Sequence, residues 1–128
     1  MNALPCVCCG HLVFESVGSY EICPLCFWED DLVQLRWPTH AGGANSTSLV
    51  QAQVNYQAFG ACDENDRQQV RPALPGEPVD TAWRLIDLAR DLFEDWESSE
   101  RAPWPQDASV LCWWLPTFWR RDQPLVPQ

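Results

Sequence analysis

The sequence predicts a small α+β protein with an N-terminal hairpin that carries four metal-binding cysteines, two main helices and an aromatic-rich C-terminal segment. Three observations lead to this fold class. Two closely spaced cysteine pairs lie near the start of the 128-residue chain. Two later stretches repeat apolar residues at helical spacing. The chain holds eight tryptophans, most of them in its second half, and its length allows one domain or a metal module with an extension.

The cysteine pairs have the spacing C-x2-C-x13-C-x2-C, with Cys6 and Cys9 in the first pair and Cys23 and Cys26 in the second. Four thiolates in two such pairs suit tetrahedral zinc, because each short loop wraps one ion and together they complete its coordination shell. Gly10 permits a positive φ directly after the first pair. We therefore expect one structural Zn²⁺ per chain in a zinc-ribbon site. Iron takes the same ligands and geometry, so the spacing leaves both metals open.

The other sulfur and imidazole groups are expected to be secondary. Cys8 lies between two ligands, so its side chain should point away as a spare thiol. Cys62 and Cys112 are expected to be small buried hydrophobic residues. His11 and His40 are alternative ligands that four cysteines make unnecessary.

Residues 11–22 are expected to form the hairpin between the two cysteine loops. His11–Glu15 reads as one strand, Val17–Ser19 as the turn and Tyr20–Ile22 as the returning strand. A two-stranded ribbon is marginal by itself, so the metal should supply much of the folding free energy, on the order of 10 kcal/mol.

The helical pattern predicts two main helices. The first spans about 48–59, with Ser46 or Ser48 as N-cap and Gly60 as the residue that ends it. The second spans 80–97, with Asp80 as N-cap. Residues 32–47 should be irregular, residues 62–71 polar with a short helical piece, residues 72–79 a Pro/Gly-rich linker, residues 98–107 a loop, and 110–121 an aromatic tail broken at Pro116.

Several ordered segments resemble the bacterial cysteine-rich CPCC domain family over roughly residues 5–72. They are Cys6–Gly10, Gly18–Asp31, Gly42–Asn45, Ser48–Leu49, Asn55–Tyr56 and Phe59–Glu64. Val7 departs from the family, which usually has Pro there. The resemblance implies a small zinc-binding bacterial domain without an established catalytic activity. Such domains can occur beside toxin genes, which implies an immunity role. We accordingly divide the chain into a CPCC-type domain, 1–72, and a helical, Trp-rich extension, 73–128, packed on it.

The formal net charge is −10, and arginine supplies all of the positive charge. This balance argues against binding to duplex nucleic acid or to a membrane surface, since phosphate contacts need clustered Lys or Arg. It suits a basic protein partner, although acidity also keeps a Trp-rich chain in solution. The chain shows no secretory signal peptide and no membrane-spanning segment. The total of seven cysteines is odd and the pairs are close in sequence, which fits metal binding in a reducing cytoplasm better than secreted disulfides.

The sequence contains no nucleophile–base motif and no phosphate loop, so we expect no enzyme activity. The leading hypothesis is a zinc protein that neutralises a basic toxin domain. Two alternatives remain: a zinc-ribbon module in transcription or RNA binding, which would use Trp119 with Arg120 and Arg121, and a redox or metal-storage protein, which rests on the seven cysteines. The expected partner-binding residues of the leading hypothesis are an acidic edge and apolar anchors: Glu29, Asp30, Asp31, Trp113, Trp114 and Trp119.

Overall fold

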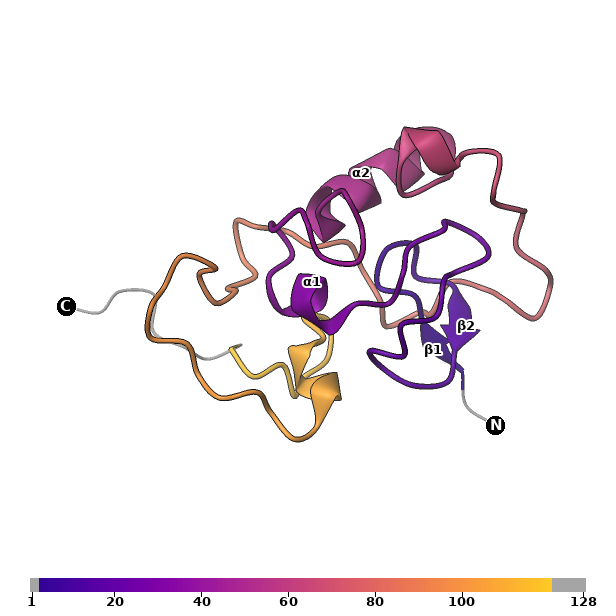
Figure 1. Ribbon diagram of the computed structural model, residues 1–128. Coiled ribbons are helices and arrows are strands. Elements are labelled where there is room, and N and C mark those ends of the chain that lie inside the picture. Colours follow the sequence, from indigo (N-terminus) through magenta and orange to yellow (C-terminus); the bar gives the residue numbers. More distant parts are fainter. Residues whose placement is uncertain (1–2, 121–128) are drawn as a thin grey trace.

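The computed structural model describes residues 3–120 and has the α+β character that the sequence predicts. Figure 1 shows the hairpin at one end, a helix along one side, and the C-terminal segment passing beside a short central helix. The elements in chain order are β1 (Leu4–Pro5), β2 (Leu12–Phe14), α1 (Leu32–Arg36), α2 (Leu49–Phe59), and two single-turn 3₁₀ helices, η1 (Glu64–Asp66) and η2 (Ala108–Leu111).

The hairpin is built around the first cysteine loop and not between the two loops. Strand β1 pairs antiparallel with β2, with Leu4 opposite Phe14. The expected pairing of residues 11–15 with 20–22 is wrong, because Ile22 instead pairs with Glu29 across the second cysteine loop. Each loop reverses the chain within a few residues, so the residues that flank it become neighbours.

Helix α1 lies in a stretch that was expected to be irregular. The Asp31 carboxylate caps its first turn by accepting a hydrogen bond of 2.9 Å from the Val33 N–H. The helix ends at Trp37, directly before Pro38, which cannot continue it. Its five residues are too few to show a period, which is why the pattern did not reveal it.

Helix α2 confirms the first predicted helix and both of its caps. The Ser48 hydroxyl accepts a hydrogen bond from the Gln51 N–H at 3.1 Å. Gly60 has a φ of +84° and donates its N–H to the carbonyl of Tyr56. Leu49, Ala52 and Gln53 are buried, so the helix covers the interior with one face. The expected short helical piece after Cys62 is also present as η1, with Asp63 as its cap.

The predicted helix at 80–97 is wrong, because these residues form a chain of turns. Three aspartates each accept a hydrogen bond from the backbone N–H two residues ahead: Asp80 from Ala82 at 3.2 Å, Asp87 from Ala89 at 3.0 Å and Asp95 from Glu97 at 3.0 Å. Such Asx turns give the backbone an alternative to helical bonding.

The C-terminal segment shares one buried core with the cysteine loops. Leu111, Cys112, Trp113 and Phe118 belong to the same cluster as the loop cysteines, Trp28 and Leu49. The Pro/Gly-rich linker also contacts the hairpin, since the Leu12 N–H donates to the Pro78 carbonyl at 2.9 Å and His11 pairs with Val79. No helix among residues 3–120 is long and apolar enough to cross a lipid bilayer.

Candidate metal centre

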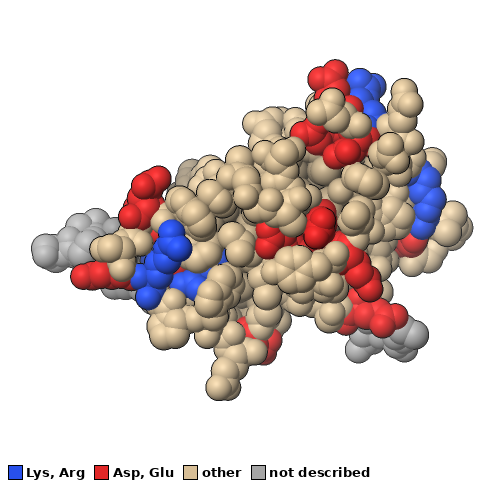
Figure 2. All heavy atoms as spheres, viewed as in Figure 1, with Lys and Arg blue, Asp and Glu red and all other residues tan. Residues whose placement is uncertain are grey.

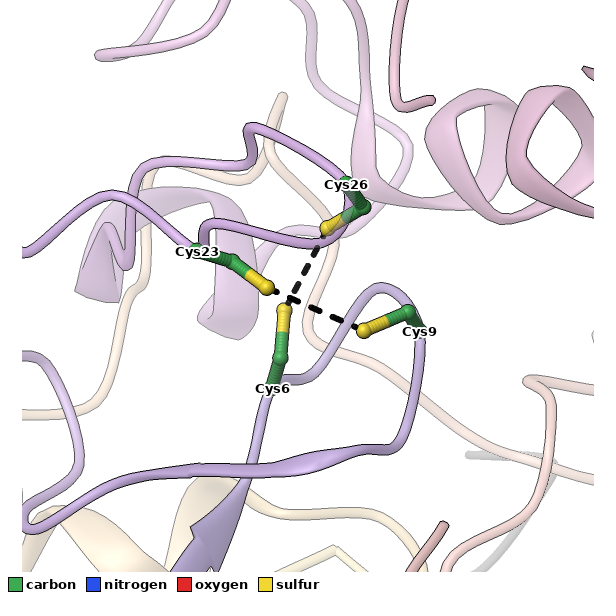
Figure 3. Close-up of side chains that lie close together, drawn as sticks. All are labelled: Cys6, Cys9, Cys23 and Cys26. Atoms are coloured by element: carbon green, nitrogen blue, oxygen red, sulfur yellow. Dashed lines mark hydrogen bonds between the residues drawn. The ribbon is translucent and has the colours of Figure 1, made fainter. Parts of the chain in front are cut away.

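The sulfurs of Cys6, Cys9, Cys23 and Cys26 converge on one point between the two loops. All four ligand atoms lie within 4.8 Å of one another, and all four residues are buried. Figure 3 shows the first pair approaching from one loop and the second pair from the other. The four thiols that the sequence analysis selected are therefore brought together, and none of them forms a disulfide.

The spacing of these sulfurs fits a tetrahedral ion. The Sγ atoms of Cys6 and Cys26 are 3.6 Å apart, and those of Cys9 and Cys23 are 3.9 Å apart. Zinc–sulfur bonds of about 2.3 Å in a tetrahedron require S···S edges of about 3.8 Å. These two edges lie on either side of this value and all four sulfurs lie within 4.8 Å of one another, so the cluster is close to the size of a four-thiolate metal site. Zinc is a plausible occupant, and the geometry equally suits iron.

The two cysteine loops share one hydrogen-bond pattern. Gly10 N–H donates to the Cys6 carbonyl and Phe27 N–H to the Cys23 carbonyl, each at 2.8 Å. Gly10 has a φ of +84° and Phe27 a φ of +72°, so each loop ends with a left-handed residue. The Leu25 N–H also points at the Cys23 sulfur at 3.3 Å, which favours a thiolate there.

The electrostatics of the cluster call for a cation. Burial raises the pKa of the Cys6 and Cys26 thiols well above their ordinary value. Hydrogen bonding to Cys23 likewise raises the pKa of Cys9, whereas hydrogen bonds from Cys26, Cys6 and Cys9 lower the pKa of Cys23. Burial and mutual repulsion thus oppose ionising all four sulfurs together when no cation is bound. A divalent ion is needed to hold all four as thiolates.

The other candidate ligands lie outside this group of four. Cys8, Cys62 and Cys112 are buried, and burial raises the pKa of Cys112 to about 12. His11 Nδ1 donates to the Glu77 carbonyl at 2.6 Å, and the His40 ring stacks on Trp96 at 3.7 Å.

The expected exposed acidic edge at Glu29, Asp30 and Asp31 is wrong for two of its three members. Asp30 is only 3% exposed and accepts hydrogen bonds from the N–H and hydroxyl of Ser19. Asp31 is 4% exposed and accepts from Ala44 N–H as well as capping α1. Both carboxylates accept hydrogen bonds from backbone N–H groups that the surrounding turns leave without a backbone partner. Glu29 alone remains partly exposed.

The expected aromatic anchors are also largely internal. Trp113 is 1% exposed, and its indole N–H donates to the Arg84 carbonyl at 3.0 Å. Trp114 packs edge-on against Trp113, and both Trp114 and Trp119 are half-buried. The nucleic-acid alternative relied on Trp119 with Arg120 and Arg121. The Trp119 ring already faces the Arg36 guanidinium at 4.9 Å, and Arg121 lies outside the described residues.

Sequence analysis missed a cluster of arginine and tryptophan beside α1. Arg36 is 3% exposed, forms an ion pair of 2.6 Å with Glu94, and lies over the rings of Trp37, Trp104 and Trp119. Arg101 lies over Trp37 and Trp96. The contact of Arg36 with Trp37 is local, but Glu94, Trp104 and Trp119 each lie more than fifty positions from Arg36, and no local pattern shows such pairings.

The charged side chains do not form a continuous basic surface on the face shown in Figure 2, where acidic groups are spread widely and basic groups lie in small patches near the edges. The fold and the cysteine cluster thus define a small acidic protein with a four-cysteine metal-binding site. The comparison with known families specifies the class further: the chain belongs to the cysteine-rich CPCC family, whose model matches residues 4–77. No curated protein matches the chain.

Proposed function

We propose that this chain is a non-catalytic, zinc-stabilised protein that binds and neutralises a protein partner, most simply as an immunity protein against a bacterial toxin. The observation that carries the proposal is the net charge of −10 on a small fold that is built around a buried four-cysteine cluster. The metal provides rigidity in this view, and the surface provides binding.

The coordination chemistry supports a structural role for the metal. Catalytic zinc sites keep a position open for water or substrate, whereas four-cysteine sites are usually closed and structural. The four cysteines are 0–2% exposed, so an ion bound between them would be shielded from water. A metal in this position would hold the two loops together. It would have no open coordination position for catalysis.

The charge supports a basic partner. Acidic residues number 18 against 8 basic ones. Three of the arginines, Arg36, Arg71 and Arg84, are already used in ion pairs with Glu94, Glu77 and Asp91. The remaining acidic excess gives the surface a negative potential, which speeds encounter with a cationic protein and repels nucleic acid. The resemblance to domains found beside toxin genes makes a toxin the natural candidate.

Co-expression tests the proposal directly. The protein encoded beside this gene is expressed in a bacterial host with and without the chain, and growth and co-purification are measured. We expect protection and a complex whose association rate falls as salt rises. A control chain with Cys23→Ser, which should lose the metal and its fold, should not protect. Absence of both protection and co-purification with the folded, metal-loaded chain would reject the neutralising function.

A further inference from the structure

A groove beside the second cysteine loop combines carboxylates with exposed apolar side chains. We define the loop groove by six of its lining residues: Ile22, Phe27, Glu29, Asn45, Asp63 and Asp66. Building on the proposed function, we infer that the loop groove receives a cationic segment of the partner protein, in which Lys or Arg alternates with apolar residues. This surface replaces the buried residues Asp30, Asp31 and Trp113 as the contact site.

One wall of the groove is the pair formed by Ile22 and Glu29. These residues lie opposite each other in an antiparallel bridge, so their side chains project from the same face. Ile22 is 47% exposed, which is high for a large aliphatic residue. The amide of Asn45 bonds both the N–H and the carbonyl of Glu29 at 2.9 Å, which fixes the Glu29 backbone, and Glu29 itself is half-buried.

The groove is also lined by Asp63, the N-cap of η1, and by Asp66 within η1. One oxygen of Asp63 accepts from the Asn65 N–H at 2.8 Å, which orients the carboxylate. The Cys62 N–H donates to the Cys26 carbonyl at 2.7 Å, so this segment is fastened to the metal loop. Among residues 3–120, the ion pairs of the molecule use none of the three groove carboxylates.

Phe27 contributes an apolar side chain to the lining of the groove. This residue has a φ of +72°, a backbone conformation that costs a side-chain-bearing residue about 1–2 kcal/mol and that Gly10 adopts freely in the matching position of the first loop. The phenyl ring is half-buried and packs against the core. Its remaining surface adds apolar area to a groove that Glu29, Asp63 and Asp66 also line.

Size and charge together define the occupant. The groove volume is about 280 Å³, at the lower limit of ~300 Å³ for small-molecule pockets, so it suits one or two side chains of a protein. A lysine or arginine can lay its aliphatic stem along Ile22 and Phe27 and direct its charge to the carboxylates. A four-thiolate centre with a divalent ion carries a net charge of about −2 and adds to the field beneath.

Binding of a defined probe tests the groove. The probe is a short fluorescein-labelled peptide in which Lys and Leu alternate, titrated with the metal-loaded full chain and followed by fluorescence anisotropy. The groove variant carries Glu29→Gln and Asp66→Asn. Its control carries Glu97→Gln and Glu100→Gln, which removes the same charge from exposed positions on the C-terminal segment. A second pair compares Ile22→Ser with Val54→Ser, since Val54 is 56% exposed on α2.

We expect the groove variant to weaken probe binding about five- to tenfold and Ile22→Ser about fivefold, while both controls stay within about twofold of the parent chain. Equal losses in the groove and control variants would show non-specific charge attraction and overturn the inference, as would undiminished binding by the groove variants. The same variants are then used in the co-expression assay. If the groove variants still protect, the groove is rejected as the contact site and the neutralising function is kept. If the parent chain does not protect, the neutralising function is rejected, and the peptide titration alone decides whether the groove binds a cationic segment.

Discussion

The indole ring of Trp83 lies against the α-carbon of Gly10, where no side chain has room. A methyl group at Gly10 would overlap the Trp83 ring, and the φ of +84° at Gly10 already disfavours any other residue. A residue in the C-terminal segment is thus packed onto the backbone of the first cysteine loop. This contact makes the glycine a structural requirement for two separate reasons.

Three glycine substitutions separate these reasons. Gly10→Ala should lower the free energy of unfolding by about 2–4 kcal/mol, because it adds backbone strain and a steric overlap. Gly60→Ala has the same φ of +84° but open space around it, so only the strain of about 1 kcal/mol should appear. Gly76→Ala meets neither problem and should change little. Denaturant unfolding measures all three, and equal effects at Gly10 and Gly60 would show that the Trp83 contact contributes nothing.

Metal removal should unfold the N-terminal region. In small zinc modules, metal binding contributes on the order of 10 kcal/mol to folding. A strong chelator, or Cys6→Ser, should remove this contribution. We expect one metal ion per chain by elemental analysis and loss of the cooperative transition after chelation. Cys112→Ala is the control, because this buried thiol lies outside the four-cysteine cluster. The variant should keep its full metal content. A chelated chain that still melts cooperatively would contradict the structural role of the ion.

Glu94→Gln should be more damaging than an average surface change. The side chain of Arg36 is 1% exposed and that of Glu94 is 6% exposed, so either partner alone is a buried, unpaired charge. Breaking such a pair costs about 3–5 kcal/mol. The double variant Arg36→Met with Glu94→Gln removes the stranded charge and should recover a large part of the loss. A double-mutant cycle by thermal unfolding gives the coupling, and additive losses would show that the pair is not coupled.

Asp30→Asn and Asp91→Asn should act in opposite directions at neutral pH. Burial raises the pKa of Asp30, so the folded state holds its proton more tightly than the unfolded state, and charging this group costs stability as pH rises above about 4. The asparagine variant can still accept from Ser19 and should be as stable as the parent or more so. Its advantage over the parent should grow as pH rises through that window.

Asp91 shows the reverse sign. Burial opposes ionisation there, but the hydrogen bonds from Arg84 at 2.7 and 2.8 Å prevail and lower the pKa of Asp91. Its charge therefore stabilises the fold above the unfolded pKa, and this contribution is lost as pH falls. Asp91→Asn should cost about 1–3 kcal/mol at neutral pH. Unfolding curves at neutral pH that rank the two variants in the opposite order would contradict both assignments.

Local chemistry explains which parts of this fold could be read from the sequence. The four-cysteine cluster and helix α2 were predictable because a C-x2-C loop and the caps at Ser48 and Gly60 act within a few residues. The helix expected at 80–97 had the right apolar spacing, yet Asp80, Asp87 and Asp95 bond the backbone two residues ahead and compete with it. The strand partners were misassigned because each cysteine loop is itself the turn.

The contact surface was the least predictable feature. The run from Glu29 to Asp31 looks uniformly acidic in the sequence, but Asp30 and Asp31 are turned inward to bond N–H groups at Ser19, Val33 and Ala44. The Val33 bond is a local helix cap, but Ser19 and Ala44 lie 11 and 13 residues from their carboxylates, so tertiary turns set those partners. Trp113 is likewise buried by packing in the core with the cysteine loops, and its bond to the Arg84 carbonyl satisfies the indole N–H there; the sequence shows neither contact.

The side-chain amide of Gln53 donates to the Val7 carbonyl at 3.0 Å and accepts from the Ile86 N–H at 3.1 Å. It thus joins helix α2 to the sulfur-bearing loop in one direction and to the turns of the C-terminal segment in the other. A chain shortened after residue 77 would leave this amide with one bond where it now has two, and would bare the face of Gly10 that Trp83 covers. A shortened chain should therefore exchange its metal faster, although all four cysteines are still present.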